Sequence, residues 1–328
     1  MSAGSLRVLE LYCGIGGLAA ALQPAAGVTE IVAAVDVNRL ATDVYCRNFP
    51  DHQVVTAVVE SVAAESWRRW NADLWWLSPP CQPFTRRGNR RDLADPRTAT
   101  LLAVLERLAE IRPRYVALEN VPPFRGSGTH GRWLRTLERS GYTAVRETVL
   151  CPTELGIPNR RRRYYLVAGR VPRLLPFPAP RQRSDSSAVR PLAGYLDRHP
   201  SPQLDVDPGL VARYPGALDI VDAGDPDAVT ACFTSAYGRS PVRSGSYLAK
   251  GPTDAIRRFS PAEILRLLGF PGAFRLACGL PGDESPVSSV SIGNAWRLAG
   301  NSLSIAAVRT VLAAIPELAA ALGSSADG

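Results

Sequence analysis

The sequence is poor in the residues that most often bind metal ions or cross-link secreted proteins. Its histidines are His52, His130 and His199. Its cysteines are Cys13, Cys46, Cys81, Cys151, Cys232 and Cys278, and no two of them form a Cys-x-x-Cys pair. Zinc sites and disulfide frameworks both need more regular spacing than this. We therefore predict no bound metal. A special role for any one cysteine has to be inferred from the residues around it.

Long apolar runs and a secretion signal are also missing. No run reaches the length of a membrane span, and the N-terminus lacks a basic segment followed by a small-residue cleavage site. Apolar residues make up 46% of the chain, which is enough for a substantial buried core. From these features we expect a soluble, cytoplasmic protein without a membrane partner, acting as a monomer.

Lysine is almost absent, since Lys250 is the only one and the other basic residues are arginine. The formal net charge is +8 and the sequence pI is about 9.5. Such a balance favours a polyanionic partner, and nucleic acid is the first candidate. The abundance of arginine, alanine and proline also reflects genome composition, so the charge gives modest support to that partner.

Short apolar runs alternate with amphipathic stretches over the first 170 residues. The runs expected to form strands are 6–11, 30–36, 54–59, 73–77, 115–119 and 163–168. Helices are expected from residue 18, from a cap at Asn38 to about residue 49, and over 97–111. Strands that alternate with helices predict an α/β fold with a doubly wound, mostly parallel sheet.

The alternation breaks down between residues 171 and 256, where prolines cluster and no periodicity remains. This composition predicts a boundary followed by a small irregular domain. The pattern returns at Ser260, which is placed to cap a helix over 261–268 with Glu263 three residues later. A last helix is expected over 304–322, jointed at Pro316.

The first apolar run ends in a glycine-rich turn, residues 10–19, which reads ELYCGIGGLA. Glycines at that point allow a ligand to approach the backbone amides that begin a helix. Asp36 ends the next run, where a carboxylate can bind the hydroxyls of a ribose. Any adenosine-containing cofactor fits this arrangement, and NAD remains an alternative because Gly14-x-Gly16-x-x-Ala19 also satisfies the dinucleotide pattern.

Cys81 lies in the segment 78–84, which reads SPPCQPF and follows the fourth expected strand. The carboxyl edge of a doubly wound sheet is where such folds bind ligands. Prolines on both sides stiffen the segment. A buried structural cysteine gains nothing from that setting, whereas a thiolate that must meet one atom does. We therefore interpret Cys81 as a nucleophile.

Polar groups are expected near Cys81 at the same edge. Glu119 ends the next strand, from which a carboxylate can hydrogen-bond or protonate a ring nitrogen. Four arginines precede the last strand, at 160–163. Alternate residues of an extended chain share a face, so Arg161 and Arg163 are expected to point together and to hold a base carbonyl or a phosphate. Arg160 and Arg162 fit a solvated basic run.

Taken in order, these segments resemble the cytosine-5 methyltransferase family. The matching pieces are the glycine loop at Gly14, PPCQ at Cys81, ENV at Glu119, the arginine run, and GNS at residues 300–302. The resemblance covers about 6–169 and 259–311. It implies a Rossmann-like fold that binds S-adenosylmethionine, with residues of about 171–257 inserted as a recognition segment.

Within the family, the sequence is most similar to the tRNA-aspartate cytosine-5 methyltransferases. The similar segments are LELY at 9–12, DVN at 36–38, PFTR at 83–86 and PTELGIPN at 152–159. Asn159 stands where DNA-directed relatives carry glutamine. The tripeptide CFT at 232–234, with Tyr237 and Gly238 behind it, matches a signature of the same branch. Pro122 and Pro123 depart from that branch, as does the lack of a lysine patch in the recognition segment.

The resemblance implies a role for each matching residue. Cys81 is expected to attack C6 of a cytosine, Glu119 to contact N3, Arg163 to hold the base carbonyl and Arg161 to support the loop. Contacts with the cofactor are implied for Tyr12, Gly14, Ile15, Gly17, Asp36, Val37, Glu60, Ser61, Pro80, Asn301 and Ser302. Contacts with the substrate are implied for Gln82, Thr85, Asn120, Cys232, Phe233 and Thr234.

The resulting expectation is an S-adenosylmethionine-dependent methyltransferase that acts on a cytosine in a tRNA anticodon loop. Its domains are expected at 1–170 (catalytic and cofactor-binding), 171–257 (target recognition) and 258–328 (returning to the catalytic domain). A DNA cytosine-5 methyltransferase acting on duplex DNA is the main alternative, although a duplex reader normally needs more groove-reading structure. Two further alternatives are a catalytically silent binding protein on the same fold and an NAD oxidoreductase. Both hypotheses account for fewer of the motifs.

Overall fold

The computed structural model describes residues 4–84, 92, 96–178, 190–251, 255–276 and 290–323. The chain divides into two compact units. Unit 1 comprises Met1–Leu150, Arg162–Ala179 and Val308–Gly328, and unit 2 comprises Cys151–Arg161 and Pro180–Ala307. The domain boundaries expected from the sequence remain a prediction, because compact units defined by contacts need not coincide with functional domains.

Unit 1 is built on a seven-stranded sheet with the order β3-β2-β1-β4-β5-β7-β6. The strands are β1 (Leu6–Leu11), β2 (Thr29–Asp36), β3 (Val54–Thr56), β4 (Leu74–Leu77), β5 (Tyr115–Asn120), β6 (Ala144–Leu150) and β7 (Arg163–Gly169). The first five in chain order are parallel, whereas β7 runs antiparallel to both β5 and β6. The expected α/β fold with a mostly parallel sheet is confirmed.

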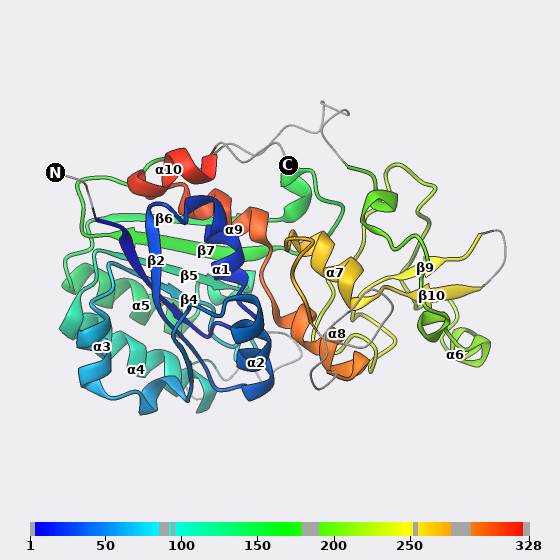
Figure 1. Cartoon of the computed structure of the whole chain (residues 1–328), viewed down its shortest axis with the longest axis horizontal. Coiled ribbons are helices and arrows are strands. Elements are labelled where there is room, and N and C mark those ends of the chain that lie inside the picture. The colour runs from blue at the N-terminus through cyan, green and yellow to red at the C-terminus, as the bar shows by residue number, and fades with distance from the viewer. Residues whose placement is uncertain are drawn as a thin grey trace. The chain divides into compact units, whose positions relative to one another are not determined.

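Helices cover both faces of this sheet (Figure 1). They are α1 (Gly17–Leu22), α2 (Arg39–Asn48), α3 (Ala64–Trp70), α4 (Pro96–Ile111), α5 (Gly128–Arg139), α9 (Ile305–Leu312) and α10 (Pro316–Gly323). Alternate strand residues such as Leu9, Trp75 and Leu118 share one core with apolar side chains of α3, α4 and α5. The opposite face meets the C-terminal helices, where the Tyr115 hydroxyl donates to Glu317 Oε2 at 2.8 Å.

Local sequence signals account for several helix ends. Asn38 caps α2 by accepting from the Ala41 amide at 3.4 Å, as expected. Ser260 and Glu263 form the expected capping box at the start of α7 (Pro261–Leu268). A break follows α9, and α10 begins at Pro316, where a joint was predicted. The elements of unit 1 that were missed include α3, α5 and the edge strand β6, whose residues are mostly half-exposed and therefore lack an apolar run.

Unit 2 contains a three-stranded sheet with the order β10-β9-β8. Its strands are β8 (Ile220–Val221), β9 (Tyr247–Ala249) and β10 (Ile256–Arg258), and its helices are α6 (Pro208–Arg213), α7 and α8 (Ile292–Asn301). The remaining described residues form turns and short 3-10 helices, consistent with the many prolines of this region.

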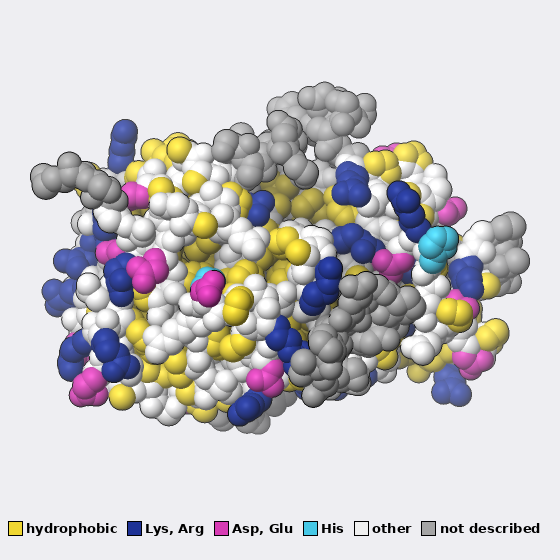
Figure 2. Space-filling model, in the orientation of Figure 1, with side chains coloured by type: hydrophobic (Ala, Val, Ile, Leu, Met, Phe, Trp, Pro, Cys, Tyr) yellow, Lys and Arg dark blue, Asp and Glu magenta, His cyan; other side chains and the backbone are white. Residues whose placement is uncertain are grey.

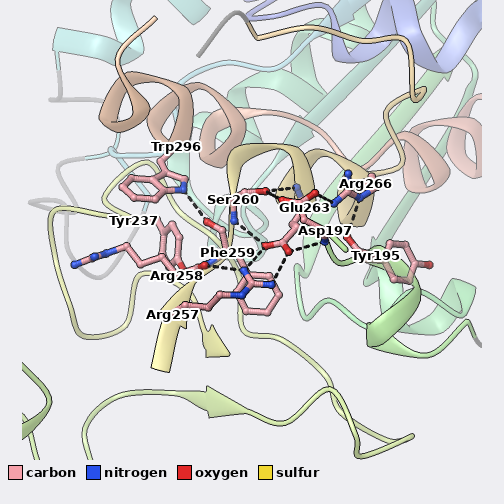
Figure 3. A network of polar contacts seen from close by, with 10 residues as sticks. All are labelled: Tyr195, Asp197, Tyr237, Arg257, Arg258, Phe259, Ser260, Glu263, Arg266 and Trp296. Carbon is pink, nitrogen blue, oxygen red and sulfur yellow. Dashed lines mark hydrogen bonds and ion pairs between the residues drawn. The ribbon is translucent and has the colours of Figure 1, made fainter. Parts of the chain in front are cut away.

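A buried polar network connects β10 to α7 in unit 2 (Figure 3). The Arg257 guanidinium pairs with the Glu263 carboxylate at 2.7 and 2.8 Å, and the two side chains are 4% and 0% exposed. Glu263 also accepts from the backbone amides of Ser260 and Asp197, each at 2.8 Å. These bonds compensate the carboxylate for its lost hydration, as a buried charge requires.

Charged side chains are spread over the face shown in Figure 2. Among the described residues of that face, Asp and Glu side chains lie between the Lys and Arg side chains. Among the described residues, no single helix is long and apolar enough to cross a membrane. Ile292–Leu312 and Pro316–Gly323, bent by 117°, meet the length and composition criteria only as a pair.

The first prediction concerns the ion pair in Figure 3. Glu263→Gln should lower the free energy of unfolding by about 3 kcal/mol, because it leaves the Arg257 charge buried without its partner. Urea unfolding and the melting temperature measure this effect. Asp205→Asn is the matched control, since Asp205 pairs with Lys250 in the same unit but on the surface, where an ion pair contributes about 0–1 kcal/mol. Equal effects for the two variants would contradict this account.

Candidate active site

The turn between β1 and α1 has a backbone that favours glycine. Gly14 and Gly16 have φ angles of 53° and 91°, and Tyr12 also has a positive φ, of 57°. A Cβ on Gly16 would lie 2.6 Å from the Phe49 ring. The turn therefore holds its shape through left-handed residues and close packing, and it leads into the first turn of α1, which begins at Gly17.

Asp36, at the carboxyl end of β2, holds this turn in place. Its Oδ2 accepts from the Gly14 amide at 2.9 Å and its Oδ1 from the Asn38 amide at 2.8 Å. Burial raises the pKa of the Asp36 carboxyl, although these amides oppose the shift. Beside it, Val37 is 64% exposed, a large apolar side chain left open to solvent. An exposed apolar surface next to a carboxylate suits the base and the ribose of an adenosine.

Further side chains surround the glycine turn. The Tyr12 hydroxyl donates to Thr100 Oγ1 at 3.0 Å, which ties the turn to α4. Burial raises the pKa of Tyr12, and the carboxylates of Glu60 and Asp36 raise it further, so Glu60 acts on the same region. The Ser61 hydroxyl donates to the Val58 carbonyl at 2.7 Å, and Ile15 is buried.

Glu10 lies beneath the turn as a buried carboxyl group within β1. Its Oε1 accepts from the Leu18 amide at 3.2 Å, and its Oε2 is 3.0 Å from the Tyr45 hydroxyl. The same hydroxyl lies 3.1 Å from His52 Nδ1. Burial raises the pKa of Glu10 to about 8, so the group is largely protonated at neutral pH. The sequence offered a signal for it, namely a charged residue inside an apolar run.

Cys81 is half-buried in the segment that follows β4. The Asn120 amide donates to the Pro79 carbonyl at 3.3 Å, and the Phe84 amide donates to the Cys81 carbonyl at 3.0 Å. Pro80 and Gln82 are exposed beside it. Asn120 is itself buried, so it holds the Cys81 segment from the neighbouring strand. Thr85, expected to contact substrate, lies outside the described residues.

Glu119 and Arg163 form an ion pair at the same edge of the sheet. Arg163 Nε lies 3.1 Å from Glu119 Oε1, and the side chains are 17% and 11% exposed. The register explains why they meet with Cys81 at one edge. Leu77, the last residue of β4, pairs with Leu118, and Glu119 pairs with Tyr165 of the antiparallel strand β7. The start of β7 therefore lies at the carboxyl ends of β4 and β5.

Arg161 has a different environment, within unit 2. Its guanidinium donates to the carbonyls of Phe233 at 3.0 Å and Gly300 at 3.2 and 3.3 Å, and to the Ser302 carbonyl. The Cys232 sulfur lies 3.5 Å away. Arg161 is buried and joins the CFT segment to the GNS segment through these bonds.

The CFT and GNS segments also touch through Gly300. A Cβ at this position would lie 2.3 Å from the backbone of Thr234, so only glycine permits the contact. Phe233 packs its ring against Tyr237 and Phe259 in the core of unit 2. Cys232 is half-buried, Asn301 is exposed and Ser302 is buried.

Asn159, which distinguished the tRNA branch in the sequence, is buried in unit 2. Its amide donates to Thr230 Oγ1 at 2.9 Å and to the Ala231 carbonyl at 3.1 Å. The residue therefore fixes the chain directly before Cys232. The structure thus gathers Cys81, Glu119, Arg163 and Asn120 within unit 1, and Arg161, Asn159 and the CFT and GNS segments within unit 2.

Comparisons with known proteins show which family the chain resembles. The family described as C-5 cytosine-specific DNA methylase matches residues 6–200. A tRNA (cytosine(38)-C(5))-methyltransferase from Bos taurus is 31% identical, over 94% of this chain and 98% of that protein. A DNA (cytosine-5)-methyltransferase from Dictyostelium discoideum is 27% identical, over 94% and 93%. The crystal structure of the Dnmt2 methyltransferase from S. pombe has a TM-score of 0.77 and 30% identity, covering 94% and 97%.

The second prediction follows from the buried carboxyl of Glu10. Because the pKa of Glu10 is raised from 4.5 to about 8 in the folded protein, its contribution to stability is fully present below pH 4.5 and is lost as the pH rises through 8. Glu10→Gln mimics the protonated form and should flatten this loss, which has a slope of at most about 1.4 kcal/mol per pH unit. Urea unfolding between pH 5 and pH 9 measures it.

Glu10→Ala serves as the control for that series. It also removes the titrating group, but it leaves a cavity and the Leu18 amide without its acceptor, so stability should fall at every pH. A Glu10→Gln variant that retained the wild-type slope would show that another group causes the pH dependence.

The third prediction concerns the contact between Gly300 and Thr234. Gly300→Ala should lower the stability of unit 2 by about 2 kcal/mol or more, since the new methyl group overlaps backbone atoms that cannot move independently. Thermal unfolding measures the change. Gly293→Ala, in the same helix, has nothing within 4 Å of its new Cβ, and should stabilise the helix by up to about 1 kcal/mol. Similar losses in both variants would argue against the contact.

Proposed function

This chain belongs to the C-5 cytosine-specific DNA methylase family, and on that premise we propose that it methylates a cytosine in the anticodon loop of a tRNA through a covalent adduct of Cys81. Enzymes of this family use S-adenosyl-L-methionine. The observation that carries the proposal is the convergence of Cys81, Glu119 and Arg163 at one edge of the unit 1 sheet. That edge is where doubly wound folds act on their ligands.

The glycine turn and its surroundings fit the cofactor. Left-handed glycines open the backbone in front of α1, Asp36 offers a carboxylate to a ribose, and Val37 offers an exposed apolar side chain to an adenine. When bound, S-adenosyl-L-methionine supplies an electrophilic methyl group. We assign cofactor contacts to this turn, to Glu60 and Ser61, to Pro80 beside Cys81, and to Asn301 and Ser302 of unit 2.

The proposed chemistry begins at Cys81. Its thiolate attacks C6 of the cytosine, and the pyrimidine ring then becomes nucleophilic at C5. Glu119 contacts N3 and assists protonation there, while Arg163 holds the base carbonyl. Their ion pair at 3.1 Å keeps both groups oriented before a base arrives. After methylation, loss of the C5 proton and elimination of the thiolate release the product. The base has to leave its stack to reach these groups.

A tRNA is favoured as the substrate by residues of unit 2. The buried Asn159 and the CFT segment are shared with the tRNA branch of the family, and Arg161 and Gly300 hold that segment to GNS. Relatives that match nearly the whole chain are named as tRNA methyltransferases. A single-stranded loop also suits a small recognition segment, because its bases are already partly splayed. We assign substrate contacts to Gln82, Thr85 and the CFT segment.

Methyl transfer from labelled S-adenosyl-L-methionine tests the substrate. Wild-type protein should label a tRNA pool and leave duplex DNA unlabelled, and bisulfite sequencing of the RNA should locate the modified cytosine. Labelled duplex DNA with silent tRNA would replace the tRNA proposal with a DNA methyltransferase.

The fourth prediction tests the nucleophile. Cys81→Ala should lower turnover by about three orders of magnitude or more, because no other group forms the bond to C6. Its affinity for S-adenosyl-L-homocysteine should remain within about twofold of wild type, since the thiol touches the base and not the cofactor. Cys46→Ala, which alters an exposed cysteine of the same unit, should retain activity. Substantial turnover by Cys81→Ala would rule out the covalent route.

A further inference from the structure

The outer face of α5 carries a row of arginines, which we call the α5 stripe. Its members are Arg132, Arg135 and Arg139, and all three are exposed. Their three- and four-residue spacing puts them on one side of the helix. The other side packs inward, where Trp133 and Leu137 are buried in the core of unit 1. At 1.5 Å per residue, the stripe is about 10 Å long.

The surroundings of the α5 stripe do not neutralise its charge. None of the three guanidinium groups forms an ion pair with another described residue. Glu138 is the one acidic residue in the sequence of α5, and its side chain is exposed. Like charges three and four residues apart repel one another and destabilise a helix. The stripe is therefore unfavourable in the isolated chain, and an anionic partner would relieve that repulsion.

The α5 stripe begins close to the sheet edge that carries Glu119 and Arg163. His130, in the first turn of α5, has its Nε2 atom 3.1 Å from the Tyr164 hydroxyl oxygen. Tyr164 directly follows Arg163 and pairs with Asn120 across the sheet. The first arginine of the stripe comes two residues after His130, and all of these residues belong to unit 1. A nucleic acid whose base reaches this edge can therefore lay its backbone along α5.

Gly131 leaves the surface open beside the stripe. It lies within the helix, and of the described atoms outside the local backbone only Arg135 Nη1, at 3.3 Å, would be near a Cβ placed there. The packing of unit 1 thus does not require a glycine at this position, although glycine weakens a helix interior. Helix side chains lean toward the N-terminus, and Arg135 accordingly lies back over Gly131. The missing side chain lets a ligand approach this guanidinium closely.

The polar character of this face favours phosphate groups over a protein or a membrane. Thr136 is half-buried between the arginines, and Leu134 packs against the core. Protein interfaces usually have an apolar or aromatic centre, and a helix that lies on a membrane needs an exposed apolar face. An arginine, in contrast, binds phosphate oxygens with two parallel hydrogen bonds. Among polyanions, RNA fits the site that this helix adjoins.

We propose that the α5 stripe binds phosphate groups of the tRNA backbone outside the methylated loop. This inference rests on the proposed function for the identity of the nucleic acid. Phosphate contacts supply affinity and fix orientation without reading sequence. The stripe thus strengthens binding of the tRNA body, and the choice of base stays with the groups at the sheet edge. It also gives a source of RNA affinity to a chain whose recognition segment lacks a lysine patch.

The fifth prediction tests the stripe with the double variant Arg132→Gln/Arg135→Gln. Fluorescence anisotropy with a labelled tRNA-aspartate transcript, repeated between about 50 and 200 mM salt, measures affinity and its salt dependence. Each lost phosphate contact removes about 0.7–0.9 from the slope of log affinity against log salt, so two should reduce it by about 1.5. The Kd should rise about tenfold. Adding Arg139→Gln should reduce the slope by about 0.8 more.

Steady-state methylation separates this role from catalysis. In the double variant the KM for tRNA should rise about tenfold, whereas kcat should stay within about twofold of wild type, since the arginines do not touch the reacting base. The melting temperature should be unchanged or higher, because glutamine favours helices and the like-charge repulsion is relieved. A lower kcat with unchanged KM and salt slope would contradict the inference.

Arg47→Gln/Arg69→Gln is the matched control. Arg47 and Arg69 are exposed in the last turns of α2 and α3, and neither forms an ion pair with a described residue. The control removes the same net charge from unit 1, and its Kd for tRNA should stay within about twofold of wild type. Equal losses in the two double variants would assign the effect to net charge alone and overturn the inference.

The two proposals fail in different ways. If the wild type binds tRNA but does not methylate it, the proposed function is wrong, and the anisotropy series still decides the role of the stripe. If the wild type methylates tRNA and Arg132→Gln/Arg135→Gln binds it with unchanged affinity and salt slope, only the stripe is wrong. A variant that lost affinity for duplex DNA and kept its affinity for tRNA would assign the stripe to DNA and overturn the RNA assignment.

Discussion

The register between β4, β5 and β7 decides which side chains meet in unit 1. Because Leu77 pairs with Leu118, the chain leaves β4 beside Glu119, and the Asn120 amide then reaches the Pro79 carbonyl. The antiparallel direction of β7 brings its first residue, Arg163, to the same edge. A shift of one residue in either pairing would turn Glu119 or Arg163 to the other face. The ion pair between them therefore depends on the register of β5 with β7.

Buried polar groups hold the segments that leave this framework. Asp36 and Glu10 accept hydrogen bonds from backbone amides around the glycine turn. In unit 2, Arg161 donates to backbone carbonyls and Glu263 accepts from backbone amides. Each of these side chains loses its hydration on burial, and several hydrogen bonds compensate for that loss. Replacing any one of them alone therefore lowers the stability of the fold. Glu10 differs from the others because burial raises its pKa to about 8. A neutral acid under the turn adds no negative charge to the region that Asp36 already makes negative.

Much of unit 1 could be predicted from the sequence because its strands are short apolar runs and its helices carry caps. Asn38 and Pro316 mark helix ends of unit 1 by local chemistry alone, and Ser260 does so in unit 2. Cys81 could be singled out because it follows such a strand, and Glu119 because it lies near the carboxyl end of one. In contrast, β6 is half-exposed at the sheet edge, and α5 begins with two glycines and a histidine, so neither presents a clear period.

The environment of Arg161 lay beyond sequence reasoning for a different reason. Its partners, Phe233 and Gly300, stand about 70 and 140 residues further along the chain, and no local pattern encodes such pairings. Alternation along an extended chain suggested one shared face for Arg161 and Arg163, but β7 begins only at Arg163. Side chains alternate between faces only within a strand, and Arg161 lies two residues before β7 begins.

The CFT and GNS segments meet at a tightly packed junction in unit 2. Gly300 admits the Thr234 backbone with no room for a methyl group, and the Arg161 guanidinium bonds to carbonyls on both sides. A segment assigned to substrate recognition and a segment assigned to the cofactor are therefore one packed body within unit 2. A mutation that alters either segment will disturb the other. The contacts of Arg161 and Gly300 therefore tie the conformation of the CFT segment to that of the GNS segment.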